Sequence, residues 1–238
     1  SEFARAHQLF VIEDCAQSFG TKIQEKNTGI FGDIGFLSFN RGKNLPTYNG
    51  GCVFTNSQRL SETINIETDK LEEQSRFLNF MLPFKMMALS LAIRPAIYGM
   101  FYPLISGFKD NRVPNDFLVN KYTSFQSGVG MSLLKRIDEF SQDRYRNGMT
   151  LINGLRDIKK VMLPNISNEK KPAFNRLPVV IKDFILREEI KKVLLKSGID
   201  ISYMYLRPIH HIFDLGYKKE DFPRATYFAE HLLTLPTH

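Results

Sequence analysis

The sequence predicts an α/β fold, with a mainly parallel sheet and its helices first and a smaller α+β lobe after it. Two short apolar runs, residues 9–12 and 33–39, each lead into turn and polar residues, which is typical of buried parallel strands. Apolar residues at helical spacing follow between residues 127 and 158. An apolar run at 177–181 before an amphipathic stretch at 184–196 predicts a strand and a helix of the α+β lobe.

Composition limits the classes of partner. The chain has 238 residues, enough for one large or two small domains, and its net charge of +7 favours anionic ligands such as nucleotides, or anionic membrane surfaces. It shows no zinc-ligand spacing, no RNA-binding aromatic signature and no compact basic block, so we expect neither a metal nor a nucleic-acid partner. Cys15 and Cys52 lie in strand-like contexts, and no signal-peptide pattern is present. Together these features predict a cytoplasmic protein with two reduced, buried thiols.

Polar side chains follow both predicted strands. Asp14 and Gln17 come after the first run, and Ser38 and Lys43 come at the end of the second. We expect them to meet at the carboxyl edge of the sheet, where open α/β sheets bind ligands. A lysine among apolar and Gly residues readily forms a Schiff base, and a carboxylate there can pair with a protonated pyridine nitrogen, as pyridoxal phosphate chemistry requires. The alternative is that Asp14 caps a helix and Lys43 is a solvated loop residue.

The order of residues in these segments is more specific for one protein family than their composition is. The stretches IEDCAQSFG, FGDIGFLSFNRGKNL and NGGCVFTN closely resemble the DegT/DnrJ/EryC1/StrS family of sugar aminotransferases, a branch of the fold-type I pyridoxal phosphate enzymes. The resemblance implies the large domain of that fold. It also implies that Lys43 is the catalytic Schiff-base lysine, that Asp14 partners the pyridine nitrogen, that Gln17 lies against the cofactor ring, and that Ser38 donates to the phosphate.

The same resemblance implies the reaction and the assembly. It predicts amino transfer to a nucleotide-linked keto sugar, with glutamate as the expected donor, in cell-surface polysaccharide or related amino-sugar biosynthesis. It also predicts a homodimer with two shared active sites. In the family an asparagine near this point reaches the partner's cofactor phosphate. Asn120 is the nearest candidate, although it is displaced by one position and Lys121-Tyr122 replaces the family's Tyr-Arg; an ordinary loop residue is the alternative. His210 and His211 stand where the family has a segment near the substrate mouth, or are loop histidines.

The resemblance divides the chain into three parts. Residues 1–75 correspond to the C-terminal part of the cofactor-binding large domain, 76–114 to a hydrophobic helical insertion, and 115–238 to an incomplete small α+β lobe. Family members carry a long N-terminal region, with the phosphate-binding loop, before this point. We therefore expect an internal fragment of a longer enzyme, or a heavily truncated relative, that is inactive by itself.

The run at 77–108 is strongly apolar, but no charge-free stretch reaches the roughly 18–20 residues of a membrane span. Pro83, Pro95 and Pro103 predict two short helices broken at the prolines, after a helix at 57–75. Packing in a domain or dimer interface is one interpretation. The other is peripheral contact with the inner face of the membrane, helped by flanking Lys and Arg residues. Residues 115–126 are predicted as a loop that ends at Gln126, a helix-start residue, and 127–158 as one long helix or a pair.

Three rival functions stay open. The first is a sugar dehydratase of the same family; these have histidine in place of the lysine, so Lys43 argues against it. The second is a non-catalytic relative that keeps the motifs. The third is a membrane-associated interaction module built around residues 77–108, and cofactor binding would separate it from the others.

Overall fold

The computed structural model describes residues 2–92, 94, 119–205 and 207–238. These form two compact units, Ser1–Asp138 and Glu139–His238, which are described separately. The first unit takes in residues 119–138, which the predicted three-part division assigned to the small lobe. That division, which concerns the domains of the whole protein, stays a prediction, and most of the 76–114 insertion lies outside the described residues.

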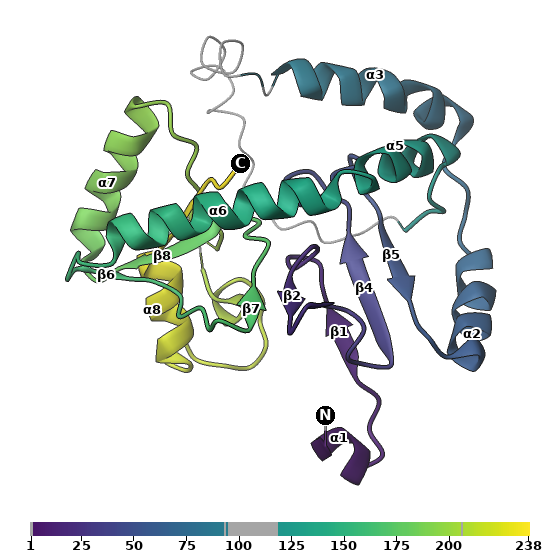
Figure 1. Ribbon diagram of the computed structural model, residues 1–238, viewed down its shortest axis with the longest axis horizontal. Helices are drawn as coiled ribbons and strands as arrows, with labels where there is room; N and C mark the ends of the chain where they lie inside the picture. Colours follow the sequence, from purple (N-terminus) through teal and green to yellow (C-terminus); the bar gives the residue numbers. More distant parts are fainter. Residues whose placement is uncertain (1, 93, 95–118, 206) are drawn as a thin grey trace. The chain divides into compact units, whose positions relative to one another are not determined.

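A three-stranded sheet is the centre of the first unit. Its order is β1 (Ile12–Asp14), β4 (Ile34–Ser38), β5 (Gly51–Phe54), as Figure 1 shows. β1 and β4 are parallel, with Asp14 opposite Phe36, whereas β5 runs antiparallel to β4. The sheet is therefore mixed over the described residues. A short antiparallel hairpin, β2 (Lys22–Ile23) and β3 (Lys26–Asn27), separates β1 from β4 along the chain.

The first strand lies later in the sequence than predicted. We placed it at residues 9–12, but the ladder begins at Ile12, which pairs with Ile34. Its partner strand begins only at Ile34, so the residues before Ile12 have no strand beside them, and Leu9 and Phe10 are exposed. The second predicted strand, 33–39, is confirmed as β4 to within one residue at each end.

The described helices of the first unit are α1 (Glu2–Ala6), α2 (Gln58–Asp69), α3 (Arg76–Ala92) and α5 (Ser124–Leu134). The side chain of Ser57 caps α2, which confirms the predicted helix start, although the helix ends six residues earlier than predicted. The predicted break at Pro83 is wrong, because α3 continues through it. Pro83 removes one backbone donor, and the carbonyl four residues back belongs to Asn79, which is exposed and can be hydrated instead. The second helix predicted for the 77–108 run lies outside the described residues.

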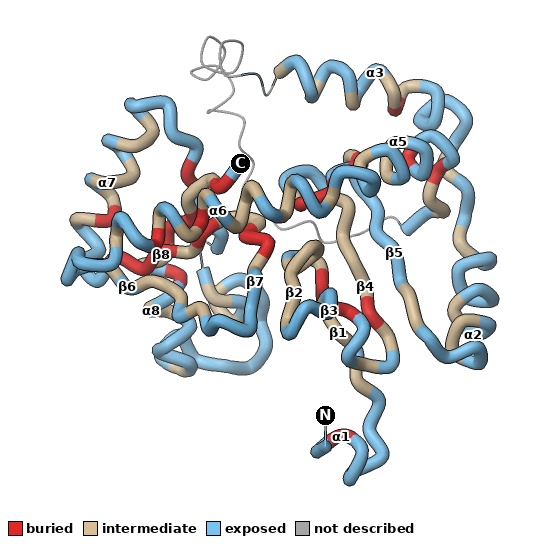
Figure 2. The backbone as a smooth tube through the Cα atoms, viewed as in Figure 1, coloured by how far each residue is buried: buried red, intermediate tan, exposed pale blue. Residues whose placement is uncertain are grey.

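The second unit contains most of α6 (Ile137–Leu155) and a three-stranded antiparallel sheet. The sheet order is β6 (Val161–Met162), β8 (Leu177–Ile181), β9 (Leu232–Leu235). The remaining elements are β7 (Lys170–Lys171), α7 (Phe184–Lys196), a 3-10 turn (Ile209–His211) and α8 (Pro223–His231). Figure 2 shows β8 as mainly buried, in a core that its inward side chains share with Ile152, Phe174, Ile201 and Leu233. This is the α+β arrangement that the sequence predicts.

Helix and strand bounds in the second unit agree closely with the predictions. The predicted strand at Leu177–Ile181 and the helix at Phe184–Lys196 are confirmed without change. The carboxylate of Asp183 accepts the Leu186 N–H at 3.1 Å and fixes the helix start, and Gly198 adopts φ +76° just past its end. The apolar stretch at 127–158 forms a pair of helices, α5 and α6, rather than one. The predicted end of the preceding loop at Gln126 is wrong, because the Thr123 side chain caps α5 and the helix begins at Ser124.

The helices that flank the sheet of the first unit are largely exposed. Figure 2 shows α2 and α3 with little buried surface, and Leu82 is the buried residue of α3. Among the described residues, no helix combines the length and the apolar character that crossing a bilayer requires.

Candidate functional site

The candidate site lies at the carboxyl ends of β1 and β4. Asp14 is the last residue of β1, and Ser38 is the last residue of β4. Because the strands are parallel and Asp14 is opposite Phe36, the two polar residues belong to the same sheet edge, on strands about 4.8 Å apart. Lys43 follows in the loop after β4, and Gln17 in the turn after β1. The fold therefore brings Asp14 and Ser38 to one edge, and Gln17 and Lys43 belong to the segments that leave it.

Asp14 is exposed and ends its strand in a turn. Its Oδ1 accepts the backbone N–H of Ala16 at 3.0 Å. No α-helix begins there, so the alternative that Asp14 caps a helix is wrong. No side chain of the described residues pairs with the carboxylate, so it is available to a cationic group of a ligand. Gln17 is exposed in the same turn.

Ser38 and Lys43 are both half-buried. The Ser38 hydroxyl accepts the Asn40 N–H at 3.4 Å, and the Lys43 backbone N–H donates to the Asn40 carbonyl at 3.1 Å. Gly42 adopts φ +80°, so the chain reverses just before Lys43. The described residues offer no anion to the Lys43 ammonium. A half-buried, unpaired lysine on a turn is suited to covalent attachment of an aldehyde.

Glu13 is a carboxylate beside this edge whose role the sequence did not reveal. Its side chain accepts three backbone N–H groups, from Gly29 at 2.8 Å, Phe31 at 2.5 Å and Gly32 at 2.6 Å. The loop before β4 is thereby fixed to β1, close to the beginning of the strand that ends at Ser38. The glycines of the contacted loop are only a weak sequence signal for such a contact, because they are 16 to 19 residues away from Glu13.

The loop that carries Lys43 is also anchored by residues that the sequence did not connect to it. Gln126, at the start of α5, donates to carbonyls of that loop, and Tyr122 packs against Gly50. Burial raises the pKa of Tyr122, and its hydrogen bond with Thr47 partly offsets this. The prediction that Gln126 is a helix-start residue is confirmed, since it closes a capping box with Thr123. The hydrogen bonds from the Gln126 side chain to the loop were not predicted.

Two further predicted groups belong to other elements of the chain. The backbone of Asn120 bridges to Glu72, and its exposed side chain forms no hydrogen bond with Asp14, Ser38 or Lys43 in the described chain. His210 and His211 lie in the 3-10 turn of the second unit, where His211 Nε2 is 2.9 Å from the Lys219 carbonyl.

Across the described ranges, no group of three or more His, Cys, Asp or Glu side chains is placed to hold a metal ion. Cys15 and Cys52 are free thiols; Cys15 is buried, but Cys52 is exposed, contrary to prediction. Cys52 lies on β5, which pairs only with β4 among the described strands.

The first unit also contains an apolar cavity of about 550 Å³. It is lined by residues of β4, the loop between β4 and β5, β5 and α5, among them Phe39, Leu45, Phe54 and Met131. Asp14, Ser38 and Lys43 do not line it, so this cavity is separate from the polar edge.

The fold of this chain is shared by solved structures of aminotransferases. DesV of S. venezuelae superposes with a TM-score of 0.72 at 22% identity, over 99% of this chain and 54% of that chain. The PLP form of Spr1654, a putative sugar aminotransferase of Streptococcus pneumoniae, superposes with a TM-score of 0.68 at 18% identity, over 100% and 55%. These likenesses confirm the predicted fold class.

The chain belongs to the DegT/DnrJ/EryC1/StrS aminotransferase family, which residues 1–87 and 111–238 match. This confirms the resemblance found in the sequence. The GDP-perosamine synthase of Escherichia coli O157:H7 is 49% identical over 245 residues, which cover 99% of this chain and 55% of the relative. The chain spans about half the length of the curated relatives it matches.

Proposed function

We propose that the protein to which this chain belongs is a pyridoxal phosphate-dependent aminotransferase that acts on a nucleotide-linked keto sugar. The observation that carries the proposal is the parallel pairing of β1 with β4, which brings the strand ends bearing Asp14 and Ser38 to one edge. Lys43 follows Ser38 after five residues, in the loop that leaves this edge. Family membership and the PLP form of a structural neighbour support the choice of cofactor.

The residues present suit this cofactor chemically. The Asp14 carboxylate has no described cationic partner and would hold the proton on the pyridine nitrogen. Gln17, three residues further, would lie against the ring, and the Ser38 hydroxyl would donate to the phosphate. The bound cofactor supplies an electron sink for a carbanion at the substrate carbon.

Lys43 would have two roles. Its ε-amino group would hold the cofactor covalently between turnovers. Once released, the same amine would act as the base that takes the proton from the substrate carbon and delivers it to the cofactor. The overall reaction exchanges the amino group of an amino acid for the keto oxygen of the sugar, so the donor leaves as a 2-oxo acid.

The proposal also covers the sugar substrate, the amino donor and the oligomeric state. The name of the 49% identical relative supports a nucleotide-linked sugar. Relatives named for spore coat polysaccharide and lipopolysaccharide biosynthesis support a cell-surface polysaccharide pathway, and we infer glutamate as the donor. We infer a homodimer in which the exposed Asn120 side chain approaches the partner's cofactor phosphate, with His210 or His211 near the sugar. Two free thiols support a reducing, cytoplasmic location.

Amino transfer by the whole protein tests the proposal. Glutamate and pyridoxal phosphate should yield 2-oxoglutarate in a first half-reaction, and a GDP- or dTDP-linked 4-keto sugar should return the cofactor to its starting form. Lys43→Arg keeps the charge but should lower the rate at least about a thousandfold, because it removes both the attachment point and the base. Cofactor binding without 2-oxoglutarate would favour a non-catalytic relative, and release of water from the sugar instead would favour a dehydratase. Either result would contradict the proposal.

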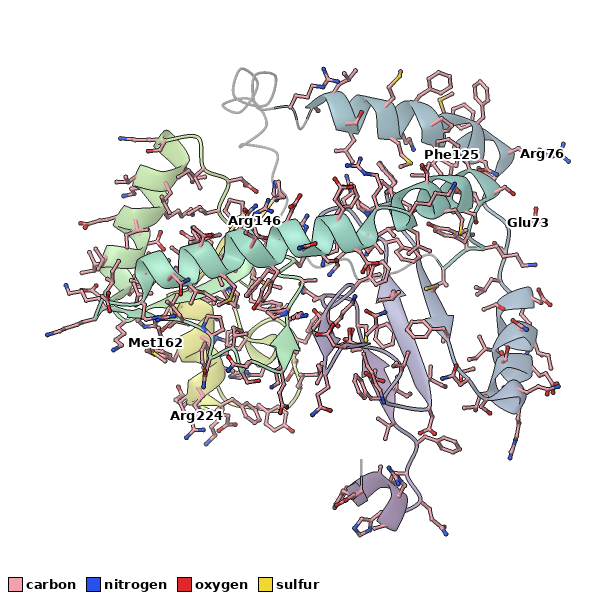
Figure 3. The ribbon with its side chains drawn as sticks, in the orientation of Figure 1. Glu73, Arg76, Phe125, Arg146, Met162 and Arg224 are labelled. Atoms are coloured by element: carbon pink, nitrogen blue, oxygen red, sulfur yellow. The ribbon has the colours of Figure 1, made fainter. Side chains whose placement is uncertain are left out.

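The surface of α3 supports a second proposal, about where the protein is located in the cell. We propose that α3 contacts an anionic membrane surface. Phe77, Phe80, Phe84, Met87 and Leu91 recur at spacings of three and four residues, so they form one stripe, and all are exposed, Phe77 by 70% and Phe80 by 64%. From Arg76 to Ala92 the helix has no acidic residue, and Arg76 and Lys85 supply positive charge. Figure 3 shows the side chains along α3, from Arg76 at its first turn.

Vesicle co-sedimentation of the whole protein tests this contact. We expect binding to vesicles of phosphatidylcholine with phosphatidylglycerol, but not to phosphatidylcholine alone, and weaker binding at high salt. Phe80→Glu should abolish it, whereas Phe228→Glu, at an exposed phenylalanine of α8, should not. Equal binding by both variants, or a change in oligomeric state caused by Phe80→Glu alone, would overturn the proposal and favour a protein interface.

A further inference from the structure

The loop between β4 and β5, residues 39–50, carries Lys43 and has few hydrogen bonds of its own. Its ends are joined because the Phe39 N–H donates to the Gly50 carbonyl at 2.8 Å, and the Thr47 N–H donates back to the Phe39 carbonyl at 2.9 Å. Between these bonded residues the chain forms a long loop that includes Lys43. A loop of this kind needs outside contacts to hold one conformation.

Gln126 provides such contacts from α5. Its side-chain Nε2 donates to the carbonyls of Thr47 at 3.2 Å and Asn49 at 3.1 Å, and to the Asn49 side-chain oxygen at 2.6 Å. Its Oε1 accepts from the Thr123 N–H at 3.2 Å and the Thr123 hydroxyl at 3.0 Å. Only 3% of Gln126 is exposed. Both ends of this buried amide are therefore fully used, one by the helix cap and the other by the loop.

Neighbouring groups reinforce the same connection. Thr47 is fully buried, and its hydroxyl is hydrogen-bonded to Tyr122 at 2.5 Å and donates to the Asn49 carbonyl at 3.1 Å. Gly50 adopts φ +95°, and a Cβ there would lie 2.7 Å from the Tyr122 ring, so the loop approaches this tyrosine as closely as it can. Figure 1 shows α5 at the carboxyl end of β4, where these contacts occur.

Lys43 is held from its other side as well. Asn44, the next residue, is buried, and its Nδ2 donates to the Phe19 carbonyl at 2.8 Å, in the segment that follows Asp14 and Gln17. The lysine backbone thus lies between one anchor to the β1 turn and another to α5. Loss of the Gln126 contacts would loosen the loop around Thr47 and Asn49, while the Asn44 contact remains.

We propose that Gln126 is a positioning residue for Lys43, which fixes the loop so that the lysine amine stays beside the edge formed by Asp14 and Ser38. The proposal rests on the proposed function of Lys43. A capping role alone would use only Oε1 of Gln126, whereas the three contacts of Nε2 all go to the loop. The amide donor is therefore the part of the side chain that the capping box does not explain.

The test compares Gln126→Met with Thr123→Ala in the whole protein. Both weaken the cap of α5, but only the first removes the donor to the loop. In Gln126→Met we expect hydrogen exchange at the Thr47 amide to speed up about tenfold or more. We also expect kcat for amino transfer to fall between about tenfold and about a hundredfold, since a small misplacement of a reacting group has effects of this size, with KM for the donor little changed. Thr123→Ala should leave both quantities near those of the parent.

Asn49→Ala provides a second variant that does not alter α5. Asn49 is exposed, so folding should survive, and the loss of the 2.6 Å contact should change exchange and kcat in the same direction by a smaller amount. If Gln126→Met matches Thr123→Ala in exchange at Thr47 and in kcat, Gln126 is only a helix cap. If the loop loosens but kcat holds, positioning is refuted while Lys43 keeps its role. Absence of any cofactor adduct on the parent protein would instead refute the proposed function.

Discussion

Replacing Glu13 by alanine removes the acceptor of three backbone N–H groups in the loop that precedes β4. Two of these bonds, from Gly29 and Gly32, are partly buried, and the one from Phe31 is exposed. A donor left without a partner in a partly buried setting costs about 1–3 kcal/mol, whereas water can replace the exposed bond. We therefore expect Glu13→Ala to lower the free energy of unfolding by about 2–5 kcal/mol.

Glu13→Gln should fall between the parent and Glu13→Ala. One carboxylate oxygen accepts from Phe31 and Gly32 and the other from Gly29, so the amide keeps one acceptor and turns an NH₂ group toward the remaining donor. We expect a loss of about 1–3 kcal/mol for this variant. These are large fractions of the roughly 5–15 kcal/mol that stabilises a typical domain.

Urea unfolding followed by circular dichroism measures the effect as a shift of the midpoint at constant slope. The matched control is Glu67→Ala, which removes an exposed carboxylate paired with Lys70 on the surface of α2. Such surface pairs contribute about 1 kcal/mol or less. If Glu13→Ala is no more destabilising than this control, the three hydrogen bonds do not hold the loop and the reasoning is wrong.

Three further predictions concern single positions. Burial raises the pKa of Glu188, but hydrogen bonds from Tyr203 and Arg187 lower it by more, so the pKa in the folded protein lies below its usual value. The carboxylate therefore stabilises the fold above its unfolded pKa of about 4.3. This contribution is lost as the pH falls through the lower folded pKa. Unfolding measured against pH should show Glu188→Gln less stable than the parent near neutrality, with the difference shrinking in acid; a constant difference would contradict this. Leu177→Ala, at a fully buried core position, should cost about 2–5 kcal/mol by urea unfolding, and a cost below about 1 kcal/mol would show that β8 is poorly packed. Gly50→Ala should lower the melting temperature, because φ there is +95° and the new Cβ would meet a tyrosine ring; an unchanged melting temperature would exclude that approach.

The parts of the fold that the sequence predicted well are those with local causes. The mainly buried apolar run of β8 and the side-chain cap of Asp183 give Leu177–Ile181 and Phe184–Lys196 clear ends. The beginning of β1 depends instead on where its partner β4 begins, 22 residues further along the chain. No local pattern near residue 9 carries that information. Pro83 misled for a different reason, since an exposed helix tolerates the loss of one hydrogen bond.

The candidate site divides in the same way. Asp14 and Ser38 follow directly from reading polar residues at strand ends, and the parallel pairing of the strands brings them to one edge. The residues that fix this edge were missed, because Glu13 and Gln126 act on segments 16 to 79 residues away. A capping-box pattern, Thr123-Ser-Phe-Gln126, was readable in the sequence, but it accounts for only half of the contacts that Gln126 makes.

The central claim is that Lys43 carries the cofactor. The most direct measurement is borohydride reduction of the whole protein after incubation with pyridoxal phosphate, followed by peptide mapping by mass spectrometry. We expect one stable cofactor adduct, on the peptide that contains Lys43, and none in Lys43→Arg. An adduct on a different lysine, or no adduct in the parent protein, would contradict it.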